Sequence, residues 1–190
     1  MLNSEYFAEE LAYIQNPETK QFATQLVNLF PPYFEEKPSS STGKYHSAWS
    51  NCVGGLRAHT KAVAYMAKEL APAYELSADE TDAAIIASLV HDAIKYGFSG
   101  GKHTSKTHES EGAFFFEKAT SKLLGASVPL PLYQKIRDAI AWHQGRWSTS
   151  EGAPKFPDGF SKLAQVVHIA DMVASRKEVR FNFNENIMIG

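Results

Sequence analysis

The sequence predicts a single all-α domain of 190 residues. Apolar residues recur at spacings of three and four along most of the chain, and alternating runs rich in Val, Ile and Thr are scarce. A chain of this length buries roughly 70% of its unfolded surface, which is enough for a core without disulfides. Its one cysteine, Cys52, excludes a disulfide framework, and no apolar run approaches the length of a membrane span. We therefore expect one helical bundle.

Two helices are expected before residue 31. The acidic, amphipathic start predicts a helix over about 4–15. Asn16 followed by Pro17 is typical of the first turn of a second helix, which should end near Phe30 because two prolines follow. The start also lacks the basic region and apolar core of a secretion signal, so we expect a cytoplasmic protein that does not attach to a membrane.

The segment 31–55 is long, polar and rich in turn-forming residues. Its aromatic residues favour an ordered loop, because disordered segments are poor in them. Clearer helical patterns follow it. Apolar residues from Leu56 to Leu70 share one face, and Ser77 with Glu80 forms a capping box at the start of the next helix. Further helices are expected over about 109–124, 131–144 and 161–177, and the last residues could form a short strand or an irregular segment.

Several metal-ligating residue types occupy positions where the helical pattern expects core residues. They are His59, the neighbouring pair His91 and Asp92, His143 and Asp171. A single histidine in such a position is more often a hydrogen-bonded core residue, and Asp171 by itself could pair with Arg176 or Lys177. Because the pattern recurs on four helices, and burying such groups is unfavourable without partners, a shared cation site explains it better.

The adjacent pair His91 and Asp92 fits such a site for a physical reason. Consecutive helical residues point about 100° apart, so both can reach one ion only near a helix end. The C-terminal end of a helix also carries partial negative charge, which favours a cation. Neutral imidazole and carboxylate ligands suit a divalent metal such as manganese, iron, nickel or zinc.

With these residues in this order, the sequence resembles the HD-domain superfamily of metal-dependent phosphohydrolases. The strings GGLRAHTKAVAYMAKEL, LVHDAIKYG and HIADMVAS carry its histidine, its HD doublet and its distal aspartate, and Lys95 matches the HDxxK form. The resemblance covers about 54–177 and implies an HD-type helical bundle over 54–178. Residues 1–53 would pack on this bundle as helices and a long ordered loop, and 179–190 would form a tail.

The resemblance also implies a ligand set. His59, His91, Asp92 and Asp171 would hold the first metal ion. Some branches hold a second ion, with the doublet aspartate bridging the two and two further histidines, which here match His108 and His143. His103 is an alternative to His108. We favour two divalent ions over one, and the ligands do not distinguish manganese, iron, nickel, zinc and magnesium.

The implied reaction is hydrolysis of a phosphate ester or phosphodiester by a metal-bound hydroxide. Asp92 would orient the water, and Lys95 would steady the phosphate charge or assist the leaving group, unless it is only a solvated lysine. The candidate substrate-binding residues are Lys44, Tyr45, His46, Lys102, Lys106 and Arg146. Tyr45, Trp49 or Trp147 could stack on a nucleobase. His168 could support the ligands, although a structural role is the better interpretation.

Two other functions are weighed beside the hydrolase. Some HD relatives use the same six ligands for two irons that activate oxygen on small organic substrates, and a non-catalytic helical module is the third possibility. The nearby lysines and Arg146 favour an anionic phosphate. The formal net charge of −2 argues against a large basic surface for duplex nucleic acid and slightly favours a small nucleotide, although a local basic patch is compatible with it. Neither the substrate nor the oligomeric state follows from the sequence.

Overall fold

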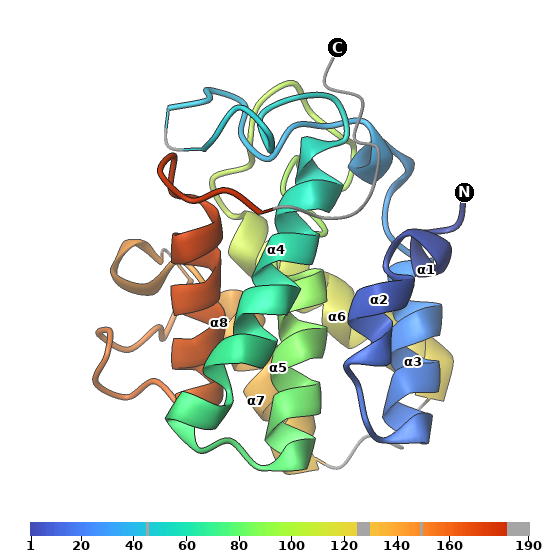
Figure 1. Ribbon diagram of the computed structural model, residues 1–190, viewed down its shortest axis with the longest axis vertical. Helices are drawn as coiled ribbons and strands as arrows, with labels where there is room; N and C mark the ends of the chain where they lie inside the picture. The colour runs from blue at the N-terminus through green and yellow to red at the C-terminus, as the bar shows by residue number, and fades with distance from the viewer. Residues whose placement is uncertain (45, 125–129, 149, 182–190) are drawn as a thin grey trace.

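The computed structural model describes residues 1–44, 46–124, 130–148 and 150–181. These residues form helices and connecting loops without any strand, which confirms the all-α prediction (Figure 1). The elements in chain order are α1 (Asn3–Tyr6), α2 (Ala8–Ala12), α3 (Pro17–Val27), η1 (Pro32–Glu35), α4 (Gly55–Leu70), η2 (Pro72–Tyr74), α5 (Ala78–Val90), α6 (His108–Leu124), α7 (Leu130–Ala141), η3 (Gly145–Trp147) and α8 (Lys162–Ala174). None of the described helices has the length and apolar character needed to cross a membrane.

Helix α5 lies at the centre of the bundle. It packs against α4, α7 and α8, and every residue from Asp82 to Val90 is buried. The capping box predicted at its start is present, since Ser77 Oγ accepts a hydrogen bond from the Glu80 backbone N–H and the Glu80 carboxylate accepts one from the Ser77 N–H. Helices α5, α7 and α8 run towards the end of the bundle at which α4 and α6 begin (Figure 1). Five helix ends therefore meet there.

The single helix predicted over 4–15 is wrong. The chain forms two short helices, α1 and α2, separated at Phe7, whose φ of −94° and ψ of 20° depart from helical values. Phe7 is fully buried, with its ring 6.2 Å from that of Phe34. Burial of this ring against the loop segment accounts for the break. The start of α3 is as predicted, with Asn16 Oδ1 accepting hydrogen bonds from two backbone N–H groups.

Three helices end earlier than the sequence pattern predicts. Helix α3 ends at Val27, α8 at Ala174 and α7 at Ala141, so His143 lies in the turn after α7. Gly145 ends this turn with a φ of +60°, a left-handed conformation that favours glycine. The turn changes the direction in which His143 projects from the helix end.

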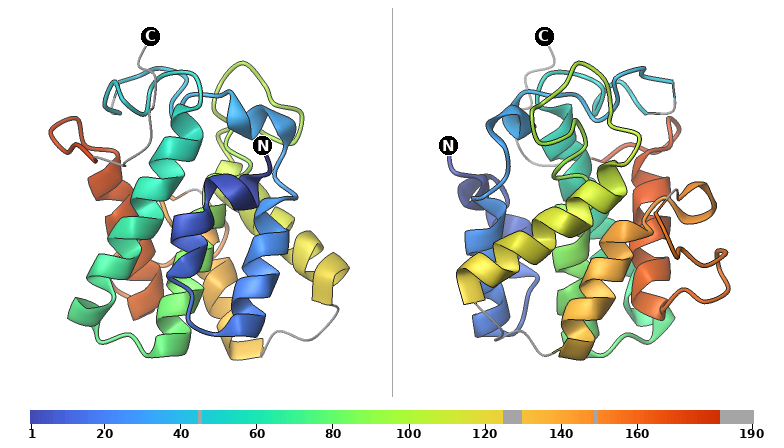
Figure 2. Two further views of the ribbon diagram at one scale, coloured as in Figure 1. Left: turned by 45° about the vertical axis from the view of Figure 1, so that its right-hand side comes forward. Right: turned by 180° about the vertical axis from the view of Figure 1, so that it is seen from behind.

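The loop 36–54 is ordered, as its aromatic content predicts. The Tyr96 hydroxyl donates a hydrogen bond to the Pro38 carbonyl, and the Thr104 N–H donates one to Ser41 Oγ. The loop also contacts the segment after α8, because Trp49 Nε1 donates a hydrogen bond to the Val179 carbonyl at 3.3 Å. The loops 36–54 and 97–107 and the segment 175–181 thus cover the end of the bundle where the five helix ends meet (Figure 2).

Candidate metal centre

Six side chains of ligand type converge beneath these loops, and they come from five places in the fold. His59 lies in the first two turns of α4, and His91 and Asp92 directly follow α5. His108 is the first residue of α6, His143 follows the end of α7, and Asp171 lies in the last turn of α8. The histidines and Asp92 are at most 5% exposed, whereas the Asp171 side chain is 19% exposed. The structure therefore brings together all six residues predicted as metal ligands.

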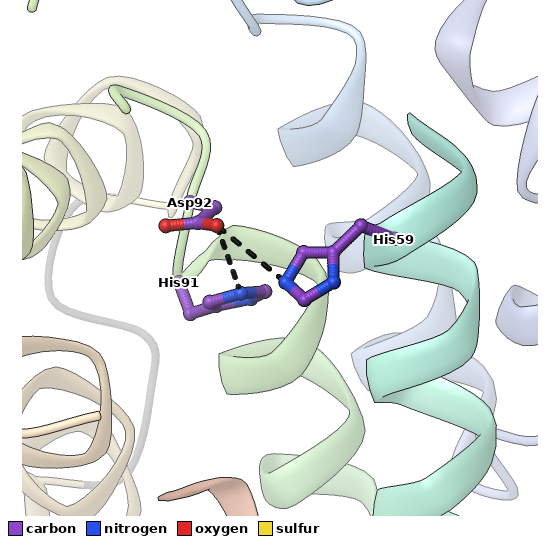
Figure 3. A group of neighbouring side chains, drawn as sticks. All are labelled: His59, His91 and Asp92. Carbon is purple, nitrogen blue, oxygen red and sulfur yellow. Dashed lines mark ion pairs between the residues drawn. The ribbon is translucent and has the colours of Figure 1, made fainter. Parts of the chain in front are cut away.

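The Asp92 carboxylate divides these side chains into two groups. Its Oδ2 lies 3.3 Å from His91 Nε2 and 3.6 Å from His59 Nε2, as Figure 3 shows. Its Oδ1 faces the other way, 3.3 Å from His108 Nε2 and 3.7 Å from His143 Nε2. Each group is close enough to hold one cation. One carboxylate is thus shared between two candidate cation positions.

Asp171 joins the first of these two groups. Its Oδ1 lies 3.0 Å from His59 Nε2 and 3.7 Å from His91 Nε2. The first group therefore offers two imidazoles and two carboxylates, and the second offers two imidazoles and the shared carboxylate. His103 is exposed in the loop 97–107, so His108 and not His103 reaches Asp92.

Backbone carbonyls orient three of the imidazoles. The Nδ1–H groups of His91, His108 and His143 each donate to a carbonyl three residues earlier, at distances of 2.6, 2.9 and 2.8 Å. Since a carbonyl can only accept, the proton of the neutral ring lies on Nδ1 and the Nε2 lone pair faces the cluster. This is the arrangement that a metal-ligating histidine requires.

Burial and charge set the protonation of the cluster. Burial lowers the pKa of His143 to about 3 and also lowers the pKa of His59 below its usual value, so both rings are neutral. Burial works against a charged His91 as well, but the Asp92 carboxylate outweighs it and raises the His91 pKa. Burial favours a neutral Asp92, but Lys95 and His91 outweigh it and hold the pKa of this carboxyl well below its usual range. The cluster therefore presents an anionic Asp92 beside the neutral imidazoles of His59 and His143, and Asp92 favours a proton on His91 when no cation is bound.

The residues present fit a divalent cation. His59 Nε2, His91 Nε2 and Asp92 Oδ1 are buried, and none of these atoms makes a hydrogen bond of acceptable geometry within the described residues. Leaving such groups without partners is unfavourable, and a cation would satisfy all three. Nitrogen and oxygen ligands of this kind suit borderline divalent metals.

Lys95 and His46 flank the cluster. Lys95 is 7% exposed, and its Nζ contacts Asp92 Oδ2, so it is a buried partner of the shared carboxylate and not a solvated lysine. The His46 ring lies edge-on to His59, 5.1 Å away between centroids, with Nδ1 2.9 Å from Ser39 Oγ. Burial, with Lys95 and His59 nearby, lowers the His46 pKa to about 3. Neutral His46 is therefore part of the wall of the site.

The other predicted substrate-binding residues lie on the surrounding loops. Lys44, Lys102, Lys106 and Arg146 are exposed, and Tyr45 lies outside the described residues. Of the predicted stacking residues, Trp147 is 55% exposed with Arg146 4.2 Å from its ring centroid. Trp49 instead packs against Phe181, with 5.7 Å between the ring centroids, and its Nε1 donates a hydrogen bond to the Val179 carbonyl. Its side chain therefore attaches the segment after α8 to the loop 36–54.

Two further residues lie near the ligands. The sequence pattern does not indicate Gln144, and it favours a structural role for His168. Gln144 Nε2 lies 3.1 Å from His108 Nε2, and nothing but its position after His143 could have signalled it. His168 Nδ1 donates a 2.7 Å hydrogen bond to the His143 carbonyl, and Phe156 packs edge-on to its ring. His168 therefore supports the turn that carries His143 from the neighbouring helix α8.

Comparison with known proteins gives one match. Searches of curated proteins and of solved structures found no similar chain. The family model of the HD domain matches residues 56–176, which include all six residues of the cluster. Divalent cations are the usual ligands of HD domains, in agreement with the buried histidine and aspartate groups found here. The all-helical bundle, the order of its ligand residues and this match together place the chain in the HD-domain family.

Proposed function

We propose that the protein is a metal-dependent phosphohydrolase that acts on a nucleotide or another small phosphate ester or phosphodiester. The observation that carries the proposal is the position of Asp92, whose two oxygens face two separate groups of imidazoles. Such a shared carboxylate suits two cations. His59, His91, Asp92 and Asp171 would hold one, and Asp92, His108 and His143 would hold the other.

Divalent cations bound there would lower the pKa of a water molecule and neutralise phosphoryl oxygens, which is the chemistry that phosphate-ester hydrolysis needs. The protein's own residues would orient the reactants. The low pKa of Asp92 keeps it anionic at neutral pH, so it can act as a ligand and accept a hydrogen bond that orients a water molecule. Lys95, held beside Asp92, would stabilise charge on the phosphate or the leaving group.

The surrounding residues would bind the substrate. Once the His108 Nε2 lone pair is used for a cation, the Gln144 amide loses that acceptor and can donate to a substrate oxygen instead. His46 borders the same space beside His59. The exposed cations at Lys44, Lys102, Lys106 and Arg146 would attract the anionic substrate, a role that suits a phosphate better than a neutral organic molecule.

The proposal is tested by metal content and turnover. Elemental analysis should find a divalent metal in the purified protein. With Mn²⁺ added, the protein should hydrolyse bis(p-nitrophenyl) phosphate or members of a panel of nucleotides. His91→Ala and Asp92→Ala should lose metal and at least roughly 100-fold in turnover, because each removes a ligand.

The matched control is His103→Ala, which removes an exposed histidine outside the cluster and should change neither quantity. Unchanged metal content in His91→Ala would contradict the assignment of the site. Oxygen uptake by iron-loaded protein without hydrolysis of any phosphate ester or phosphodiester would favour the oxygenase chemistry known for some HD relatives.

A further inference from the structure

The charges of this protein are unevenly distributed among its segments, although the chain as a whole is nearly neutral. We define the basic rim as the described residues of the segments 36–54, 97–107, 144–150 and 175–181. The rim contains eight Lys and Arg residues and two Glu, and the rest of the chain contains 11 Lys and Arg against 19 Asp and Glu. A formal net charge of −2 thus conceals a strongly positive part and a strongly negative part.

Hydrogen bonds join three of the four segments of the rim, and the segment 144–150 contacts the start of α6. Lys37 Nζ donates to the Gly101 carbonyl at 3.2 Å, which joins the first segment to the second. Ser47 Oγ donates to the Arg176 carbonyl at 3.0 Å, which joins the first to the fourth. The Ser148 hydroxyl donates to the Glu109 carboxylate next to His108, so the third segment borders the start of α6. The segment 144–150 also approaches the metal centre, because Gln144 Nε2 lies 3.1 Å from His108 Nε2.

Two segments of the rim each carry an exposed aromatic side chain. Trp147 is 55% exposed and has the Arg146 guanidinium 4.2 Å from its ring centroid. Phe98, in the second segment, is 53% exposed, and its ring meets that of Phe114 edge-on. Positive charge that follows a backbone, together with aromatic rings on which bases stack, is the combination that binds single-stranded nucleic acid.

We propose that the basic rim binds a single strand of nucleic acid and leads it to the metal centre. The inference rests on the proposed function and specifies its substrate as a phosphodiester at or near the end of a strand. A mononucleotide needs only the cations beside the cluster. The exposed side chains of Arg176, Lys177 and Arg180, beyond the last turn of α8, offer contacts that only a longer polyanion can use. Stacking on Trp147 and Phe98 requires unpaired bases, which excludes a duplex.

The test is a binding measurement that does not depend on hydrolysis. EDTA-treated protein is titrated into a fluorescein-labelled oligothymidylate of roughly 12 nucleotides, within the range of known single-strand site sizes, and anisotropy is followed over a series of NaCl concentrations. We expect saturable binding that weakens as salt rises, with a log–log slope of about −0.7 for each phosphate contact. Thymidine monophosphate should compete at least roughly 100-fold less well than the unlabelled strand, because it lacks the additional contacts.

Two double variants make the test specific. Arg176→Glu/Lys177→Glu reverses charges of the rim, and Lys118→Glu/Lys122→Glu makes the same change in net charge on exposed residues of α6 outside it. The rim variant should bind the strand at least roughly tenfold more weakly with a shallower salt slope, whereas the α6 variant should bind like the wild type. The Arg176 carbonyl bond to Ser47 is a backbone contact, so the substitution leaves it in place.

Three results would overturn the inference. They are equal weakening by both double variants, competition by the mononucleotide as strong as that by the strand, and binding to vesicles containing phosphatidylglycerol without binding to the strand. A different result would contradict the proposed function without contradicting the rim. Strand binding in EDTA, combined with no hydrolysis of any phosphate ester or phosphodiester in Mn²⁺, would support the rim and contradict the hydrolase.

Discussion

At the scale of single residues, the rings of His91, His108 and His143 are oriented by the same kind of hydrogen bond. Each ring donates its Nδ1 proton to the carbonyl three residues before it, which orients the ring and leaves Nε2 for a cation. The partner is always backbone of the same local segment: a carbonyl of the last turn of α5 for His91 and of α7 for His143, where carbonyls lack helical partners, and a loop carbonyl just before α6 for His108. The orientation of these ligands is thus built into their own helix ends.

His143 needs more support because it lies beyond the end of α7. Gly145, with its φ of +60°, allows the chain to turn, and the His168 ring fills the space beside it. A Cβ at position 145 would lie 2.4 Å from His168 Cε1. The His168 ring and the path of the backbone at Gly145 therefore depend on each other.

Gly145→Ala should consequently destabilise the protein and weaken metal binding. The left-handed backbone costs an alanine about 1–2 kcal/mol, and displacement of His168 adds to this, so we expect a loss of at least roughly 2 kcal/mol in urea unfolding. Gly152→Ala is the control, because Gly152 has a φ of +75° but open space around it. It should show the backbone cost alone and normal metal affinity. Equal effects of the two substitutions on both measurements would contradict the role assigned to His168.

At the scale of elements, the short N-terminal helices are attached to the first ligand helix by charge. Glu10 of α2 is fully buried, and its Oε2 lies 3.2 Å from Lys61 Nζ in α4. The Arg57 guanidinium of α4 lies 4.3 Å from the Tyr6 ring centroid. Burial raises the pKa of Glu10 to about 7, even though Lys61 opposes this shift. The contact between α2 and α4 therefore depends on pH.

The direction of this dependence follows from the protons bound. The folded state keeps the Glu10 proton up to about pH 7 and the unfolded state releases it near 4.5, so this group makes the protein less stable as pH rises between these values. The Glu10→Gln variant has no carboxyl group at position 10 and so takes up no proton there. Relative to this variant, the wild type should lose on the order of 3 kcal/mol of unfolding free energy over the interval, measured by urea denaturation at several pH values.

The exposed neighbour Glu9 provides the control for this prediction. Glu9→Gln should follow the wild-type pH profile in parallel. Glu10→Gln also changes the contact with Lys61 and so can alter the stability at every pH; the comparison therefore concerns the slope and not the absolute stability. Parallel profiles for wild type and Glu10→Gln would show that Glu10 does not titrate in this range.

At the scale of the whole molecule, the metal centre ties together the ends of α4, α5, α6, α7 and α8. A cation bound there contacts residues from far apart in the chain, so it should stabilise the entire fold and not one helix. Mn²⁺ at about 100 times its dissociation constant adds about 2.7 kcal/mol, which corresponds to a rise in Tm of roughly 5–10 °C for a chain of this size.

Thermal unfolding with Mn²⁺ and then with EDTA checks this expectation. The increase in Tm should be reversed by EDTA and should be much smaller in Asp171→Asn, which removes a ligand charge. Asp158→Asn changes an exposed aspartate outside the cluster and should respond to Mn²⁺ like the wild type. A Tm that is the same with and without Mn²⁺ would count against a cation at this site.

The sequence by itself determined the helical class and the ligand residues, because both depend on local patterns. Periodic apolar positions identify α4 to α8, and polar residues within those stripes mark His59, His143 and Asp171. Phe7 shows the limit of such patterns. Its surroundings have helical periodicity, but burial of its ring against Phe34, a contact with a distant segment, breaks the helix.

Only the tertiary structure decided how these residues act together. The orientation of Asp92 between two groups of imidazoles, the choice of His108 over His103 and the approach of Gln144 to His108 all depend on how five helix ends meet. The packing of Trp49 against Phe181 likewise depends on a contact between distant segments. Charge shows the difference most clearly. A net charge is a sum along the chain, whereas the basic rim exists because folding brings together segments that are far apart in the sequence.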